Sequence, residues 1–118
     1  MANFAEMLAE VRGCRGVVAT AIADREGIPV ETWGEDRQQV EEIVAEYSAF
    51  LHEVASSNRE LRLGNLEHLM VSGSRRSVLI TSITSQYFLI ALVERDGLPG
   101  KARFASRVAA ARLRGELI

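Results

Sequence analysis

The sequence predicts a mixed α/β (α+β) fold, a three-layer α/β/α sandwich around a five-stranded, mostly antiparallel sheet. Three apolar segments follow one another closely, at residues 66–72, 78–83 and 87–93. In the last of them both alternating sets of side chains are apolar, which is typical of a strand buried on both faces. Helices must therefore cover the sheet twice, and a chain of 118 residues suits one domain that spans 1–118.

The N-terminal segment predicts an amphipathic helix over residues 3–12. Its apolar side chains recur at helical spacing, at Phe4, Met7, Leu8 and Val11. The helix is expected to start at Asn3, a suitable N-cap residue, with the glutamate three residues later as its capping-box partner.

A β-hairpin is predicted next. Residues 17–23 are small and β-branched, which suits a central strand. Residues 24–27 form the expected turn, and residues 28–33 the second strand. Because Pro29 has no N–H to donate to a neighbour, we expect this second strand at an edge of the sheet.

The longest predicted helix spans about residues 37–58. We expect one apolar stripe of this helix to be buried, made of Val40, Ile43, Val44, Tyr47, Phe50, Leu51 and Val54. A second stripe holds mostly small side chains, at Ala45, Ser48, Ala49, His52 and Ser56. Such a stripe lets another helix approach closely, but alanine is also simply a good helix former, and the sequence favours the two explanations equally.

After the three apolar strands, residues 96–100 predict a turn and residues 100–117 a final helix. We expect the buried side of this helix to consist of Phe104, Val108 and Ala111, widened by Ala102, Ala109, Leu113 and Leu117. The predicted order of elements is therefore α-β-β-α-β-β-β-α.

The long helix is alone on its face of the predicted sheet. One helix is roughly 10–12 Å across and covers little more than two strands that are about 4.8 Å apart. A second copy of the chain would cover the rest if the two long helices met through the small-residue stripe. The strand at residues 66–72 would then pair with its symmetry mate across a two-fold axis.

Charge is unevenly distributed along a chain whose net charge is −2. Residues 35–53 hold six acidic residues and one arginine, whereas residues 101–114 hold five basic residues and no acidic one. These runs indicate either solvated helix faces or a face that meets a charged partner. The net negative charge argues against general binding to nucleic acid.

The chain lacks the patterns of a metal site, a cofactor site or a catalytic motif. Its two histidines, His52 and His68, have no second ligand at the spacing of a zinc site. Residues 97–101 lack the first glycine and the final Ser/Thr of a phosphate-binding loop. A single cysteine and the lack of an apolar run of about 20 residues indicate a cytoplasmic protein without a membrane span. We therefore expect no enzymatic activity, no metal and no cofactor.

Several motifs, taken in order, resemble the roadblock/dynein light-chain domain family, whose bacterial members include MglB-like proteins. These motifs lie at residues 16–24, 26–27, 45–47, 69–73, 87–93, 96–97 and 100–104. They run through nearly the whole chain, and their order is more specific than any one of them.

The resemblance implies a roadblock/profilin-like fold and a non-enzymatic homodimer, paired through the third strand and the central helix. Carried onto this chain, the dimer interface is Ala45, Ser48, Ala49, His52, Leu66, His68, Met70 and Ser72. Bacterial members of the family commonly act with small Ras-like GTPases, which implies such a GTPase as partner. The implied docking residues on the central helix are Arg37, Glu41, Glu42, Glu46 and Glu53.

Two hypotheses for the function follow. The first is a homodimeric regulator or scaffold of a small Ras-like GTPase, in a GTPase-activating or an adaptor role in bacterial signalling. The alternative is a signal- or small-molecule-sensing domain of PAS- or profilin-like build. That alternative requires a pocket of roughly 300 Å³ or more with a few convergent polar groups.

Overall fold

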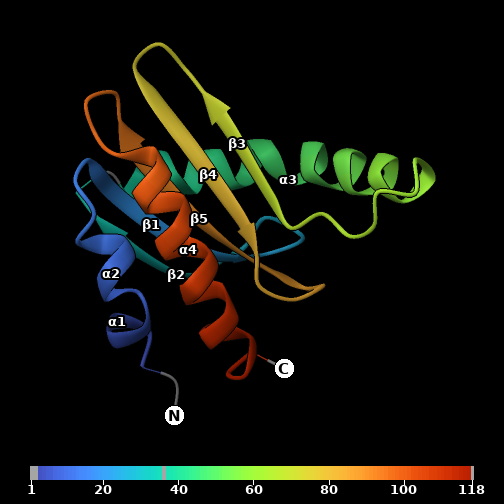
Figure 1. Cartoon of the computed structure of the whole chain (residues 1–118), viewed down its shortest axis with the longest axis horizontal. Coiled ribbons are helices and arrows are strands. Elements are labelled where there is room, and N and C mark those ends of the chain that lie inside the picture. Colours follow the sequence, from blue (N-terminus) through green and yellow to red (C-terminus); the bar gives the residue numbers. More distant parts are fainter. Residues whose placement is uncertain (1–2, 36, 118) are drawn as a thin grey trace.

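The computed structural model describes residues 3–35 and 37–117 and has the predicted five-stranded antiparallel sheet, in the order β2-β1-β5-β4-β3 (Figure 1). The predicted order of elements is confirmed, except that the first helix is divided in two. The elements are α1 (Phe4–Met7), α2 (Ala9–Arg12), β1 (Val17–Asp24), β2 (Pro29–Gly34), α3 (Arg37–Glu60), β3 (His68–Ser72), β4 (Arg76–Ser82), β5 (Tyr87–Glu94) and α4 (Pro99–Arg114).

The sheet lies between two helical layers, as predicted. One hydrophobic cluster joins the sheet to α3, and a second joins its other face to α1, α2 and α4. Strand β5 contributes to both, because Phe88, Ile90 and Leu92 lie in the first cluster and the intervening Leu89, Ala91 and Val93 in the second. The prediction that this strand is buried on both faces is confirmed.

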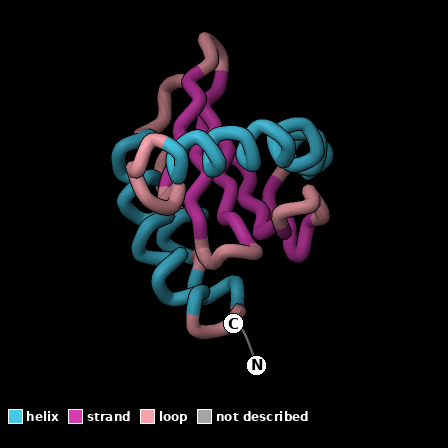
Figure 2. The backbone as a smooth tube through the Cα atoms, turned by 90° about the vertical axis from the view of Figure 1, so that its right-hand side faces the viewer, coloured by secondary structure: helices cyan, strands magenta, loops and turns pink. Residues whose placement is uncertain are grey.

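Helix α3 is longer than the sheet is wide. Its N-terminal part packs on β1, β2 and β5. Its C-terminal part extends beyond the strands to the right in Figure 1, and Figure 2 shows the helix crossing in front of the strands. Leu61 and Leu63, which follow the helix, are each 68% exposed. The face of the sheet next to β3 is therefore covered less completely than the face next to β1.

The break in the N-terminal helix lies at Leu8, whose ψ of 2° is far from the helical value of about −42°. Hydrogen bonds continue on both sides of it, from the Leu8 N–H to the Phe4 oxygen and from the Arg12 N–H to the Leu8 oxygen. Leu8 and Val11 are fully buried, so the predicted apolar stripe survives the distortion. Asn3 is the N-cap, as predicted, and its Oδ1 accepts from the Glu6 N–H at 3.1 Å.

Arg12 joins α2 to the edge strand β2. Its Nη2 donates to both carboxylate oxygens of Glu31, at 2.7 and 2.6 Å, and its Nε donates to the Thr20 hydroxyl. The guanidinium also lies 5.1 Å from the centre of the Trp33 ring. The Arg12 side chain is only 10% exposed, so this contact covers β1 and β2 on the face where α4 packs on β4 and β5.

Two chain connections cross at Gly16 and Gly97. A Cβ on Gly16 would lie 2.4 Å from the Gly97 Cα, and a Cβ on Gly97 would lie 2.7 Å from the Arg15 oxygen. Two hydrogen bonds hold the crossing, from the Glu94 N–H to the Gly16 oxygen and from the Leu98 N–H to the Arg15 oxygen. The start of β1 and the start of α4 are thereby fixed to each other.

The buried side of α4 differs from the prediction. Phe104 is 70% exposed and Val108 40% exposed, and Ala111 is exposed as well. The helix buries another row instead, which is Ala102, Ala105, Ser106, Ala109, Ala110 and Leu113. These mostly short side chains let the helix approach the sheet closely, and the larger Phe104 has no place in that narrow gap.

Candidate interaction surfaces

The inner face of α3 is a narrow row of residues packed on the sheet. Val40, Val44, Leu51 and Ala55 are buried, and they recur at helical spacing. Around this row the helix has two flanks and an outer face. The residues that sequence reasoning selected are distributed over all three.

One flank carries the small-residue stripe and faces the turn between β1 and β2. A Cβ on Gly27 would lie 3.1 Å from the Ser48 Oγ, and the His52 Nε2 lies 3.0 Å from the Arg25 backbone oxygen. Ser48 and His52 therefore contact their own chain. Ala45 and Ala49, from the same stripe, are exposed.

The opposite flank, which we call the apolar flank, consists of Ile43, Tyr47, Phe50, Val54 and, just past the helix, Leu61. Phe50 is 44% exposed although it was predicted to be buried, and its ring centre lies 6.2 Å from that of Tyr47. The sequence contained a signal for this surface, because the predicted buried stripe was wider than one helix can bury. The flank faces β4, since Gln39 on the same side binds Arg76 of that strand.

Strand β3 is an edge of the sheet, as the dimer hypothesis requires. It pairs with β4, and its other side has no strand partner among residues 3–35 and 37–117. Its side chains alternate between the two faces, and the cross-strand pairs place His68 and Met70 on the α4 side. Met70 is 45% exposed. Ser72 is exposed at the end of the strand, and Leu66 precedes the strand and packs against the α3-side cluster.

The outer face of α3 is acidic. Glu42, Glu46 and Glu53 are exposed and spaced to lie opposite the buried row. Arg37 and Glu41 are also exposed, but they lie on a separate row four residues apart. None of the four candidate glutamates forms an ion pair with a described residue. The five proposed docking residues are thus accessible, with three of them on one row.

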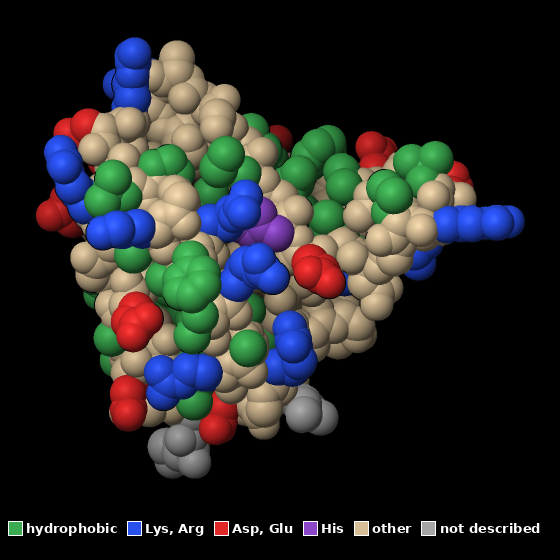
Figure 3. Space-filling model, in the orientation of Figure 1, with side chains coloured by type: hydrophobic (Ala, Val, Ile, Leu, Met, Phe, Trp, Pro, Cys, Tyr) green, Lys and Arg blue, Asp and Glu red, His purple; other side chains and the backbone are tan. Residues whose placement is uncertain are grey.

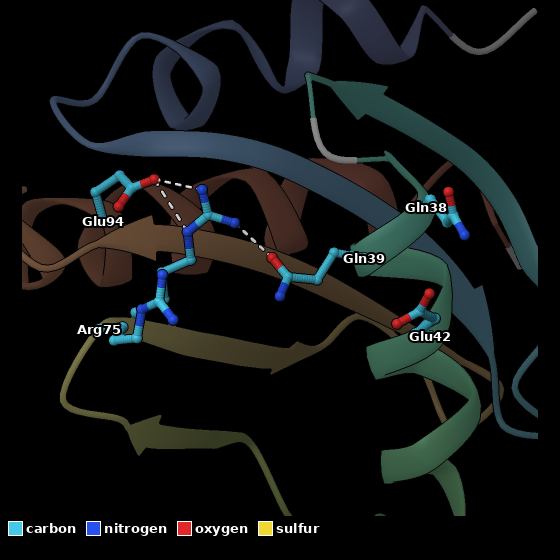
Figure 4. A pocket seen from close by; sticks show the side chains of 6 residues that line it. Gln38, Gln39, Glu42, Arg75 and Glu94 are labelled. Carbon is cyan, nitrogen blue, oxygen red and sulfur yellow. Dashed lines mark hydrogen bonds and ion pairs between the residues drawn. The ribbon is translucent and has the colours of Figure 1, made fainter.

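A hollow of about 610 Å³ lies where α3 begins, between the helix and the outer ends of β4 and β5 (Figure 4). Arg76 crosses it, donating from Nε to Glu94 at 3.0 Å and from Nη1 to Gln39 at 2.5 Å. Figure 4 shows Glu42 and Arg75 on the rim. Sequence reasoning selected Glu42 but not this network, which joins residues far apart in the chain.

Two kinds of site are missing from the described part of the chain. No three His, Cys, Asp or Glu side chains gather there in a way that could hold a metal ion. In the same residues, no helix combines the length and the apolar character needed to span a membrane.

Solved structures share this fold. The chain is similar to a Roadblock/LC7 domain from Streptomyces avermitilis, with 14% identity and a TM-score of 0.81 over 92% of this chain and 92% of that chain. It is similar to MglB in a tetrameric arrangement, with 14% identity and a TM-score of 0.84 over 95% and 85%. Profilin from Schizosaccharomyces pombe gives 15% identity and a TM-score of 0.56 over 87% and 89%. These matches confirm the predicted roadblock/profilin-like fold.

No curated protein matches the chain. The family model described as the Roadblock/LC7 domain matches residues 3–94, which run from the N-terminal helices to the end of β5. The sequence motifs at residues 16–24 and 87–93 lie inside that match, and those at residues 96–97 and 100–104 lie beyond it. Since the match covers most of the chain and the fold agrees with it, the protein belongs to the Roadblock/LC7 domain family.

Proposed function

We propose that this protein is a cytoplasmic, non-enzymatic homodimer that regulates or scaffolds a small Ras-like GTPase. Membership of the Roadblock/LC7 family supports the class, because its bacterial members commonly act with such GTPases. The observation that carries the proposal is the exposed surface of α3. This helix has an accessible acidic outer face, and on the apolar flank it leaves Phe50 and, just past the helix, Leu61 exposed.

The dimer is proposed to form through β3 and α3. A free strand edge is a template for pairing with another chain, and an isologous contact of β3 with its mate would continue the sheet. The overhanging part of α3 would then lie over the partner's sheet, where Leu61 and the apolar flank could be buried. A second chain would thus cover the side of the sheet that one helix leaves open.

The two parts of the predicted interface lie on different sides of α3. Edge strand β3 lies beyond β4, on the side of the apolar flank, whereas Ala45 and Ala49 lie on the side of the β1–β2 turn. We propose that the apolar flank packs in the dimer. The competing prediction is that the small-residue stripe packs in the dimer. The two interfaces predict opposite effects on dimerisation for substitutions on the apolar flank and on the small-residue stripe.

The GTPase is proposed to dock on the outer face of the paired α3 helices, where Glu42, Glu46 and Glu53 lie on one row. Carboxylates there would meet basic side chains of the partner and mainly raise the association rate. A regulator of this type can act without an inserted arginine, by ordering the switch loops of the GTPase that position the attacking water.

A pull-down and a GTPase assay with the Ras-like protein encoded nearest to this gene test the proposal. The double variant Glu42→Arg with Glu46→Arg is expected to weaken binding at least about tenfold. The matched control reverses two exposed acidic residues away from α3, Glu10→Arg with Glu116→Arg. Unchanged affinity in the first variant would exclude the acidic face, and the lack of binding by the wild-type protein would exclude that partner.

The sensing alternative has one observation against it and one in its favour. Against it, side chains fill the two clusters on either side of the sheet, which leaves the interior closed. A cleft of about 750 Å³ does lie at the surface, between α4 and the C-terminal part of α3. Its chemistry is independent of the GTPase proposal.

A further inference from the structure

The cleft between α3 and α4 gathers arginines from distant parts of the chain. Arg25 comes from the β1–β2 turn, Arg59 from the end of α3, and Arg107 and Arg114 from α4. Among residues 3–35 and 37–117, Glu67 is the one acidic residue that lines it. Figure 3 shows basic side chains beside a histidine on the α4 face of the molecule. The cleft therefore has a strongly positive character on a chain whose net charge is negative.

These four arginines have no acidic partner in the described part of the chain. Two other partly buried arginines are paired, Arg12 with Glu31 and Arg76 with Glu94. In the cleft Arg25 is partly buried, whereas Arg59, Arg107 and Arg114 are exposed. The pKa of Arg25 is lowered by burial and by the positive charge of Arg59. Arg25 and Arg59 thus repel each other, and neither forms an ion pair with a described residue.

Backbone contacts hold two of the guanidinium groups in place. The Arg114 Nε donates to the Ile83 oxygen at 2.7 Å, and the Arg25 Nε donates to the Ser85 oxygen. Both acceptors belong to the connection between β4 and β5 at the floor of the cleft. Since each side chain is fixed through Nε, its two terminal nitrogens remain available to a ligand.

His68 adds an unsatisfied polar atom to the same cleft. Its Nδ1 lies 3.0 Å from the Thr81 Oγ1, while its Nε2 is buried without a hydrogen-bond partner among the described residues. Burial and the charges of Arg103 and Arg107 lower the pKa of His68. Buried polar atoms are rarely left unpaired, and this one belongs to a residue in the wall of the cleft.

We propose that this cleft binds a small phosphate-bearing molecule of about nucleotide size. One guanidinium group can donate two parallel hydrogen bonds to the oxygens of a phosphate. Several guanidinium groups around one cleft therefore suit an anion with more than one phosphate group. The volume of about 750 Å³ lies within the range of small-molecule sites. Apolar residues also line the cleft, with Ala55 from α3 and Ala110 and Ala111 from α4, and could contact an uncharged part of the ligand.

Isothermal titration of the purified protein with inorganic pyrophosphate and with ADP tests the proposal, with sulfate as the anion control. Both phosphate compounds are expected to bind once per chain, and sulfate more weakly. ADP should bind tighter than pyrophosphate if its nucleoside occupies the wall of the cleft. Equal affinities would assign the site to the diphosphate alone and overturn the nucleotide-size part of the proposal.

The variant Arg59→Ala with Arg107→Ala is expected to weaken pyrophosphate binding at least about tenfold. The matched control is Arg95→Ala with Arg112→Ala, two exposed arginines outside the cleft, which should change the affinity less than about twofold. Equal losses of pyrophosphate affinity in the two variants would mean that binding depends only on the net positive charge and not on this cleft. A lack of saturable binding by the wild type at about 1 mM would refute the site.

Light scattering on Arg107→Ala alone separates this proposal from the proposed function. This variant is expected to leave the mass in solution unchanged, because Arg107 lies on α4, outside β3 and the overhanging part of α3. A protein that dimerises and binds a GTPase but not pyrophosphate would refute the cleft alone. Binding of pyrophosphate by a protein without GTPase affinity would refute the proposed function alone.

Discussion

The His52 Nε2, on α3, lies 3.0 Å from the backbone oxygen of Arg25, in the turn between β1 and β2. The contact assigns one flank of α3 to the chain's own hairpin. The flank on the other side, with Phe50, is left with an exposed aromatic ring. Which flank meets a second chain is therefore a question that single substitutions can answer.

Phe50→Glu is expected to raise the dissociation constant of the dimer at least about tenfold, because a charge would be buried on the apolar flank. Ala49→Trp is expected to leave it unchanged, since Ala49 lies on the hairpin side of the helix. Light scattering over a range of concentrations measures both. The reverse pattern, with loss in Ala49→Trp and none in Phe50→Glu, would assign the interface to the small-residue stripe.

Arg12→Ala is expected to lower the free energy of unfolding by about 3 kcal/mol, because it leaves the largely buried carboxylate of Glu31 without its partner. Arg15→Ala, three residues along and exposed, is the control and should change it by less than about 0.5 kcal/mol. Urea unfolding followed by circular dichroism gives both values. Equal small losses would mean that the ion pair contributes no more than a solvated one.

Gly97→Ala is expected to lower the free energy of unfolding by about 1–3 kcal/mol, since the added Cβ would lie within 3 Å of two backbone atoms. Gly100→Ala has open space around the Cβ and lies in the first turn of α4. It should be neutral or stabilise by up to about 1 kcal/mol. Thermal unfolding distinguishes the two, and a neutral Gly97→Ala would disprove the tight crossing.

His68 predicts a dependence of stability on pH. Because its pKa is lowered in the folded chain, the unfolded chain takes up the proton first as the pH falls. The contribution of His68 to the free energy of unfolding is fully present above its unfolded pKa of 6.5. This contribution is lost as the pH falls through the lower pKa of the folded chain. His68→Gln should therefore lose less stability than the wild type between about pH 8 and about pH 5. Urea unfolding at both pH values measures this difference, and His52→Gln shows the effect of removing an exposed histidine. Parallel losses in wild type and His68→Gln would contradict the assignment.

Local patterns predicted the strands well, because a strand buried on both faces has a composition that few other elements share. The two faces of β5 could be assigned residue by residue in this way. The buried side of α4 could not, because the prediction ranked Phe104 above the alanines by size. The fold selected the alanines, whose shortness determines how closely the helix packs.

Long-range contacts account for the rest. Ser48 and His52 were selected as interface residues from their size and spacing, and nothing local showed that the β1–β2 turn would reach them. The arginines of the cleft likewise look like ordinary solvated residues in the sequence. Only the fold brings Arg25, Arg59 and Arg107 to one place, and only the fold shows that they form no ion pair with a described residue.

The crossing of Gly16 and Gly97 also limits where this chain can change in length. An inserted residue in either connection would separate the two backbones and release the hydrogen bonds between them. Residues 61–67, which connect α3 to β3, include Gly64, where an added Cβ would touch nothing within 4 Å. Engineered insertions, such as a tag or a fluorescent label, should therefore be tolerated in that connection and not near the crossing.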